Sequence, residues 1–132
     1  MVIDTSALIA VVTGEPSAAE IEAAIDRDPK RIMAAASVLE ASIVLESRYG
    51  DAGTRELDLL IQRIPIEIPP FDGDQLEWAR YAFRTYGKGR HRAALNFGDC
   101  FSYALSKLTG EPLLFIGDDF HRTDLAAALP KG

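Results

Sequence analysis

The chain has 132 residues, of which 48% are hydrophobic and 26% charged, so we expect one soluble globular domain over residues 1–132. The formal charge of −6 argues against a protein that binds nucleic acid over its whole surface. The single cysteine, Cys100, excludes an internal disulfide, and no apolar run approaches the roughly 20 residues that span a bilayer. The first residues lack the basic and apolar regions of a signal peptide, so we expect a cytoplasmic protein without a membrane segment.

A short buried strand and a helix are expected at the start of the chain. Val2 and Ile3 are typical of a strand buried on both faces, as in a parallel sheet. Asp4 follows this strand, and Ser6 is a natural N-cap for the helical run Ala7–Val12. Ligands of open α/β sheets bind beyond the carboxyl ends of the strands, so Asp4 lies where a site is expected. The alternative is that Asp4 only helps to cap the helix.

Helices interrupted by short extended segments are expected next. Ser17, with Glu20 in the capping-box position, and Ser37 are the expected N-caps of two helices, and Gly50 ends the second. The periodicity predicts helices over residues 18–26, 38–49 and 53–64, and short strands over residues 31–35 and 66–68.

Glu40 is unusual within the second of these helices. Its neighbours at three and four positions are Ala36, Ser37, Ile43 and Val44, so it projects from a face with no other charge. A carboxylate on such a face is unfavourable unless something pairs with it. The structural alternative is an exposed flank residue near a helix N-terminus, where a Glu is favourable.

A basic segment follows the next expected helix. Asp72 and Gln75 begin this helix, an apolar stripe from Leu76 to Tyr86 continues it, and Gly87 ends it. The sequence contains no Asp or Glu between Trp78 and Gly98. The basic segment is either ordinary solvated surface or a local site for a polyanion, and its side chains are Arg80, Arg84, Lys88, Arg90, His91 and Arg92.

Further acids lie at a helix start and at a strand end. Asp99 is in the first turn of a helix expected to reach about residue 108, with Asn96 or Gly98 as cap. Apolar neighbours, including Phe97 and Cys100, predict a buried helix start, and Cys100 is expected in the core. Residues 112–116 predict a buried parallel strand that delivers Asp118 and Asp119 at its carboxyl end.

Strands alternating with helices predict an α/β sandwich with a short parallel sheet. Such a fold can gather Asp4, Glu40 and Asp99 with Asp118 or Asp119. Clustered carboxylates are unfavourable without a cation, and an all-oxygen set without His or Cys selects Mg²⁺, with Mn²⁺ as a substitute. These metals clamp phosphates and activate water for displacement at phosphorus.

The same residues carry a family resemblance along the whole chain. The motifs Val-Ile-Asp4-Thr-Ser-Ala-Leu, the mid-helix Glu40, Gly-Asp99-Cys and Phe-Ile-Gly-Asp-Asp119-Phe resemble those of a PIN-domain nuclease, and within that group of the VapC toxins of bacterial toxin–antitoxin pairs. The resemblance implies a PIN-like α/β/α sandwich and a Mg²⁺-dependent endoribonuclease that a cognate VapB-type antitoxin holds inactive. It further implies RNA as substrate, and we expect a homodimer.

The resemblance also assigns residues. Asp4, Glu40 and Asp99 match the three core acids of these nucleases. Asp119 matches the fourth, because related toxins often have Gly-Asn-Asp-Phe here, and Asp118 is then an additional acid. Ser6 matches a hydroxyl that supports the first acid, and Asn96 a polar neighbour of the third.

Other functions were weighed against this one. An aspartyl-phosphate phosphatase needs a second Asp two residues after the first, where this chain has Ser6. A receiver domain needs paired acids after its first strand and a phosphoacceptor in mid-chain, and neither is evident. The alternative that stays open is a non-catalytic RNA- or partner-binding module on the same fold. For an antitoxin helix, the apolar segments Leu39–Leu45 and Leu57–Ile64 are the expected groove.

Overall fold

A short parallel sheet lies at the centre of the computed structural model, which describes residues 1–131. Strand β1 (Val2–Ile3) pairs in parallel with β2 (Leu113–Leu114), in the register Val2 to Leu113 and Ile3 to Leu114. Single parallel bridges extend the pairing from Val2 to Ile32, from Ile32 to Glu67, and from Leu113 to Ala127. The strands predicted over residues 31–35 and 66–68 are therefore reduced to one bridging residue each.

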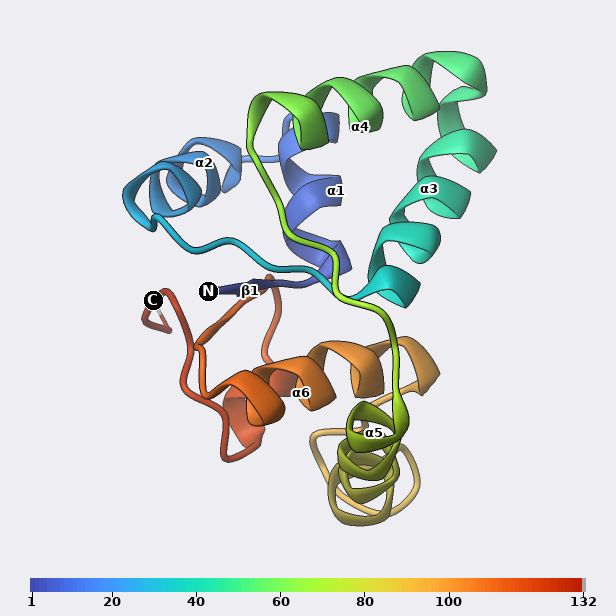
Figure 1. Ribbon diagram of the computed structural model, residues 1–132, viewed down its shortest axis with the longest axis vertical. Coiled ribbons are helices and arrows are strands. Elements are labelled where there is room, and N and C mark those ends of the chain that lie inside the picture. Colours follow the sequence, from blue (N-terminus) through green and yellow to red (C-terminus); the bar gives the residue numbers. More distant parts are fainter. Residues whose placement is uncertain (132) are drawn as a thin grey trace.

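Helices cover both faces of this sheet (Figure 1). Alternate strand residues point to opposite faces, so Ile3 and Leu114 enter one hydrophobic cluster while Val2 and Leu113 enter the other. The first cluster packs against the helices drawn above β1 in Figure 1, which are α1 (Thr5–Thr13), α2 (Ala18–Arg27), α3 (Ala35–Tyr49) and α4 (Asp51–Arg63). The second packs against α5 (Gly73–Tyr86) and α6 (Phe97–Thr109), drawn below it. The predicted α/β sandwich is confirmed.

Several helix starts differ from the predicted ones. Asp4, not Ser6, is the N-cap of α1, and Ser6 lies inside the helix. Ser17 precedes α2 as expected but makes no capping hydrogen bond with its side chain. Helix α3 begins three residues earlier than predicted because Ala34 is its N-cap, and Ser37 is inside it. For Ser6 and Ser37, the tertiary hydrogen bonds described below outweigh the usual preference of serine for cap positions.

Other boundaries are confirmed. Asp72 caps α5 by accepting a hydrogen bond from the Gln75 N–H, and Gly87 ends that helix. Gly50 ends α3 with a positive φ of 61°. It also precedes α4, which begins at Asp51 rather than at Gly53. A short 3₁₀ helix, η1 (Asp119–Arg122), follows β2.

The apolar stripe of α5 is only partly buried. Ala82 is in the core, whereas Leu76 and Phe83 are exposed along a groove of about 570 Å³ between α5 and α6. Phe97, predicted to be buried, is 81% exposed at the mouth of this groove, while Cys100 is buried as predicted. Within residues 1–131, no helix combines the length and the apolar composition that crossing a membrane requires.

Candidate active site

The first acid, Asp4, is fixed by hydrogen bonds to both of its carboxylate oxygens. Its Oδ2 accepts from the N–H of Ser6 at 3.1 Å and from the hydroxyl of Ser6 at 2.6 Å. Its Oδ1 accepts from the hydroxyl of Ser102 at 2.5 Å. A carboxylate has about four lone-pair directions, so these bonds leave one, on Oδ1, for a further ligand. Only 6% of Asp4 is exposed, because it lies between β1 and α6.

Ser6 joins the first acid to the end of the second strand. Its hydroxyl donates to Asp4 and accepts from the N–H of Ile116 at 3.0 Å. The segment that leads to Asp118 and Asp119 is thereby tied to Asp4. This placement is the supporting contact that the family resemblance implies for Ser6.

Ser102 and Ser37 belong to the same network, and sequence reasoning missed both roles. The two hydroxyl oxygens are 3.3 Å apart. Because Ser102 donates its single hydroxyl proton to Asp4, Ser37 is the donor between them. Both serines are buried. The available signal was a serine three residues after Asp99 within an otherwise apolar helix run, since a buried hydroxyl needs a partner.

Asp99 lies at the start of α6, where backbone geometry fixes it. It forms a capping box with Asn96: each side chain accepts the other residue's backbone N–H, at 2.9 and 3.0 Å. Burial raises the pKa of the Asp99 carboxyl to about 6, although the Asn96 N–H opposes the shift. The negative charges of Asp4, Asp119 and Glu40 raise this pKa further. Asp99 is thus electrostatically coupled to each of the other three acids.

Glu40 projects from α3 toward the start of α6, where Asp99 lies. It is half-buried on α3, and its carboxylate lies against Gly98 at the beginning of α6. This contact shows how Glu40 is accommodated on its otherwise uncharged face, while its role in a site stays a prediction. Its partner is a backbone surface rather than a cation.

The two neighbouring acids after β2 have different surroundings. Both are exposed, and the nearest cations are Lys131 at 3.9 Å from Asp118 and Arg122 at 4.0 Å from Asp119. The charge of Asp119 contributes to the raised pKa of Asp99. This coupling favours Asp119 over Asp118 as the fourth acid.

The donor set fits a hard cation held partly through water. All four side chains offer carboxylate oxygens, the ligands that Mg²⁺ and Mn²⁺ prefer. Within residues 1–131, no three His, Cys, Asp or Glu side chains stand close enough together to enclose an ion by themselves. Mg²⁺ ordinarily keeps several water ligands and uses only one or two carboxylates directly. The carboxylate donors therefore suit Mg²⁺ better than Zn²⁺, whose usual ligands include Cys and His.

The basic segment is distributed around one end of α5. Arg80 and Arg84 are exposed on that helix, and Arg80 pairs with Glu77 at 3.2 Å. Arg90 lies over the ring of Phe83, and Lys88 and Arg92 are exposed in the following loop, which Gly89 helps to turn.

One contact links this loop to the acids. The guanidinium of Arg122, which is 4.0 Å from Asp119, donates to the carbonyl of Arg92 at 3.3 Å. His91 has a structural role instead: its Nδ1 accepts from the Ala93 N–H at 3.0 Å, and its ring packs edge-on against Tyr86. The structure thus places the basic loop beside η1.

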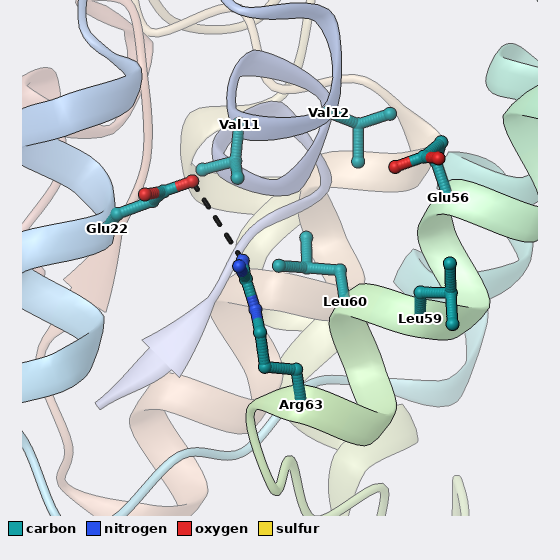
Figure 2. Close-up of a pocket in the computed structure, with 7 residues that line it drawn as sticks. All are labelled: Val11, Val12, Glu22, Glu56, Leu59, Leu60 and Arg63. Atoms are coloured by element: carbon teal, nitrogen blue, oxygen red, sulfur yellow. Dashed lines mark ion pairs between the residues drawn. The ribbon is translucent and has the colours of Figure 1, made fainter.

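A separate hollow of about 350 Å³ lies between α1, α2 and α4 (Figure 2). Glu22 and Arg63 face each other across it at 4.0 Å. The hollow includes part of the predicted Leu57–Ile64 groove, but none of the coupled acids lines it. Its lining residues are Val11, Val12, Glu22, Glu56, Leu59, Leu60 and Arg63.

Comparisons with known proteins show which family the chain matches. The PIN domain family matches residues 1–125. A protein named Ribonuclease VapC from Mycolicibacterium smegmatis is 58% identical over 127 residues, which cover 96% of this chain and 98% of that protein.

Two solved structures share the fold. The Mycobacterium tuberculosis toxin VapC20, described as cleaving the sarcin-ricin loop, superposes with a TM-score of 0.78 at 17% identity and 98% coverage of both chains. A toxin–antitoxin complex from Klebsiella pneumoniae superposes with a TM-score of 0.68 at 16% identity, covering 90% of this chain and 88% of that one. The match to the PIN family model and the 58% identity to Ribonuclease VapC show that the chain belongs to the PIN-domain family and, within it, to the VapC ribonucleases, which are toxin endoribonucleases.

Proposed function

We propose that Asp4, Glu40, Asp99 and Asp119 hold Mg²⁺, with Mn²⁺ able to replace it, and that this centre hydrolyses phosphodiester bonds of RNA. The observation that carries the proposal is the Asp99 carboxyl, whose pKa is raised to about 6 by burial and by the other three acids. A folded protein keeps such a like-charge cluster where a cation compensates it. PIN-domain ribonucleases are generally metal-dependent, and the all-oxygen donor set selects the ion.

Each acid has a role that follows from its surroundings. Asp4 and Asp99 are the direct ligands, because donors from Ser6, Ser102 and Asn96 fix their carboxylates in place. Glu40 and Asp119 act through bound water or orient the water that attacks phosphorus. When bound, the metal supplies charge stabilisation and a more acidic water molecule. Asp118 is at most an accessory acid.

No side chain in this region acts as a covalent nucleophile. The closest thiol, Cys100, is buried and donates to the carbonyl of Asn96 at 3.3 Å. Burial and the charge of Asp99 raise its pKa to about 11, so the thiol stays protonated at neutral pH. Water is therefore the nucleophile in this proposal.

RNA approaches along the basic segment. An acidic protein that binds a polyanion needs local positive charge, and Lys88, Arg90 and Arg92 are exposed beside η1. Arg80 and Arg84 extend this surface along α5, whereas the His91 ring keeps its structural contacts.

A VapB-type antitoxin controls this activity. The coupled carboxylates attract an arginine side chain, which can form paired hydrogen bonds with them and displace the metal. An amphipathic antitoxin helix fits the hollow of Figure 2, where Val11 and Leu59 are flanked by charged residues, or the exposed Leu39 and Ile43 of α3. We further propose that the protein forms a homodimer and acts in the cytoplasm.

Calorimetric titration separates this function from a non-catalytic binding module on the same fold. We expect Mg²⁺ and Mn²⁺ to bind the wild-type protein at pH 7.5 and RNA cleavage to stop in excess chelator. Binding should weaken strongly in Asp99→Asn. Cleavage that continues unchanged in chelator, or metal binding unaffected by this substitution, would contradict the proposed centre.

A further inference from the structure

Gly98 occupies a position in which any side chain would collide with Glu40. A Cβ atom at Gly98 would lie 2.5 Å from Oε2 and 2.9 Å from Oε1 of Glu40, and 3.0 Å from its carboxyl carbon. Carbon and oxygen atoms that are not bonded do not approach so closely. The carboxylate of Glu40 therefore fills the space that a side chain at position 98 would take.

The backbone itself does not require glycine here. Gly98 is the second residue of α6, and it is not among the described glycines with a positive φ, such as Gly50 and Gly110. Glycine within a helix is less stable than alanine because it loses more conformational freedom on folding. Neither the backbone conformation nor helix preference calls for glycine at position 98, whereas the space occupied by the Glu40 carboxylate does.

Among the described glycines, the neighbours of Gly98 differ in kind from those of Gly53 and Gly87. A Cβ at Gly53 would meet the backbone of Leu45, and one at Gly87 would meet Phe83. In both cases the nearest atom is a backbone carbonyl oxygen, so the glycine allows two segments of backbone to approach closely. At Gly98 the three nearest atoms all belong to the carboxyl group of one acid.

A second contact sets the same spacing between α3 and α6. One turn further along α6 lies Ser102, and one turn back along α3 lies Ser37, with their hydroxyls 3.3 Å apart. Ser102 in turn holds Asp4. The face of α6 that carries Gly98 and Ser102 therefore contacts two acids from other elements, Asp4 at the N-cap of α1 and Glu40 on α3.

We propose that Gly98 is a positioning residue that seats the Glu40 carboxylate beside Asp99 in the metal site. The inference rests on the function proposed above and adds a residue that donates no ligand. Glu40 has three rotatable bonds and carries the same charge as Asp99, so repulsion drives it outward. The bare backbone at Gly98 lets it lie close to α6 despite this repulsion, and any larger residue moves it away.

The test is a double-substitution cycle read by Mn²⁺ calorimetry and by thermal unfolding in chelator. Gly98→Ala should weaken Mn²⁺ binding about tenfold, the usual size for a group that orients a ligand. Its melting temperature in chelator should not fall, because the end of a flexible side chain can move and alanine favours the helix. In a Glu40→Ala background, Gly98→Ala should change Mn²⁺ affinity by less than twofold.

Gly73→Ala is the matched control. Gly73 also lies in the first turn of a helix, α5, and nothing within 4 Å would meet its Cβ. This variant should gain the same helix preference and keep wild-type Mn²⁺ affinity.

The outcomes separate the inference from the function on which it rests. If wild type binds Mn²⁺ and Glu40→Ala weakens binding, but Gly98→Ala binds like wild type, the role of Gly98 is wrong while the metal site stands. If Gly98→Ala weakens binding equally with and without Glu40, it acts by another route and the inference is also wrong. If Glu40→Ala leaves binding unchanged, Glu40 is outside the site and Gly98 has no carboxylate to seat. If wild type binds no metal, the proposed function itself fails.

Discussion

Asp4 and Asp99 are held in opposite electrostatic surroundings. Asp4 is surrounded by donors, the hydroxyls of Ser6 and Ser102 and one backbone N–H. Asp99 receives a single N–H from Asn96 and faces three negative charges. Asp4 is thus oriented before any metal arrives, whereas the ionised form of Asp99 is the one a cation stabilises most. This difference makes Asp99 the more sensitive probe of the metal-free site.

The metal-free protein should lose stability as the pH rises through the titration of Asp99. Its pKa is about 6 in the folded state, against 3.8 for an ordinary Asp. Between these values the folded state binds more protons than the unfolded state, so the free energy of unfolding decreases from about pH 4 to about pH 6. Asp99→Asn removes this dependence and should stabilise the metal-free protein at pH 7 by about 1 to 2 kcal/mol, after discounting for partial exposure.

Thermal unfolding in chelator from pH 4.5 to 7.5 measures this effect. Asparagine keeps an oxygen that can accept the Asn96 N–H, so the helix start is preserved in the variant. Added Mg²⁺ should raise the melting temperature of wild type more than that of the variant. A variant that is clearly less stable than wild type in chelator at pH 7 would contradict the repulsion argument.

Asp118 and Asp119 form a natural matched pair for identifying the fourth acid. Both are exposed and each is about 4 Å from one cation, so the two Asp→Asn changes have similar effects on local charge. The charge of Asp119 is among the main causes that raise the pKa of Asp99, so Asp119→Asn should lower the rate of Mg²⁺-dependent RNA cleavage about tenfold or more. Asp118→Asn should have the smaller effect. Rates in the reverse order would reassign the fourth acid to Asp118.

At the scale of elements, the site depends on how α3 and α6 approach each other. Sequence periodicity located both helices, and the start of α6 was predicted with Asn96 as a cap. The contacts of Glu40 with Gly98 and of Ser37 with Ser102 were not predicted. These pairs join residues about sixty positions apart, and local patterns carry no information on such contacts. The same limit explains why Ser37 was assigned to a cap.

The basic loop after α5 can be tested as a unit. Replacing Arg90 and Arg92 by Gln should weaken RNA binding and reduce the salt slope of log K by roughly 1.4, if each contacts one phosphate of a single strand. Arg48→Gln with Arg55→Gln, at exposed positions on α3 and α4, removes the same charge elsewhere. The measurement is the RNA-binding affinity of both double variants and of wild type between 50 and 200 mM salt. Equal slopes in the two double variants would make the loop ordinary solvated surface.

At the scale of the whole molecule, the sequence predicted the order of elements better than the exposure of side chains. The parallel pairing of β1 with β2 agrees with the expectation from the buried strand segments, whereas the shared site of Asp4, Glu40 and Asp99 stays a prediction. The exposure of Phe97 and Leu76 does not agree with their place in apolar patterns. Apolar residues left on a surface produce the same pattern as buried ones, because periodicity does not show what covers a helix face.

The main proposal is that the coupled carboxylates hold a metal ion and that this metal centre supports the cleavage of RNA. The most direct measurement is the cleavage rate of Asp4→Asn with and without Mg²⁺, beside wild type and with circular dichroism as a control for the fold. We expect Asp4→Asn to lose about 100-fold or more of the cleavage rate and to show no further response to chelator. An Asp4→Asn protein that still cleaves RNA at the wild-type rate in Mg²⁺ would contradict it.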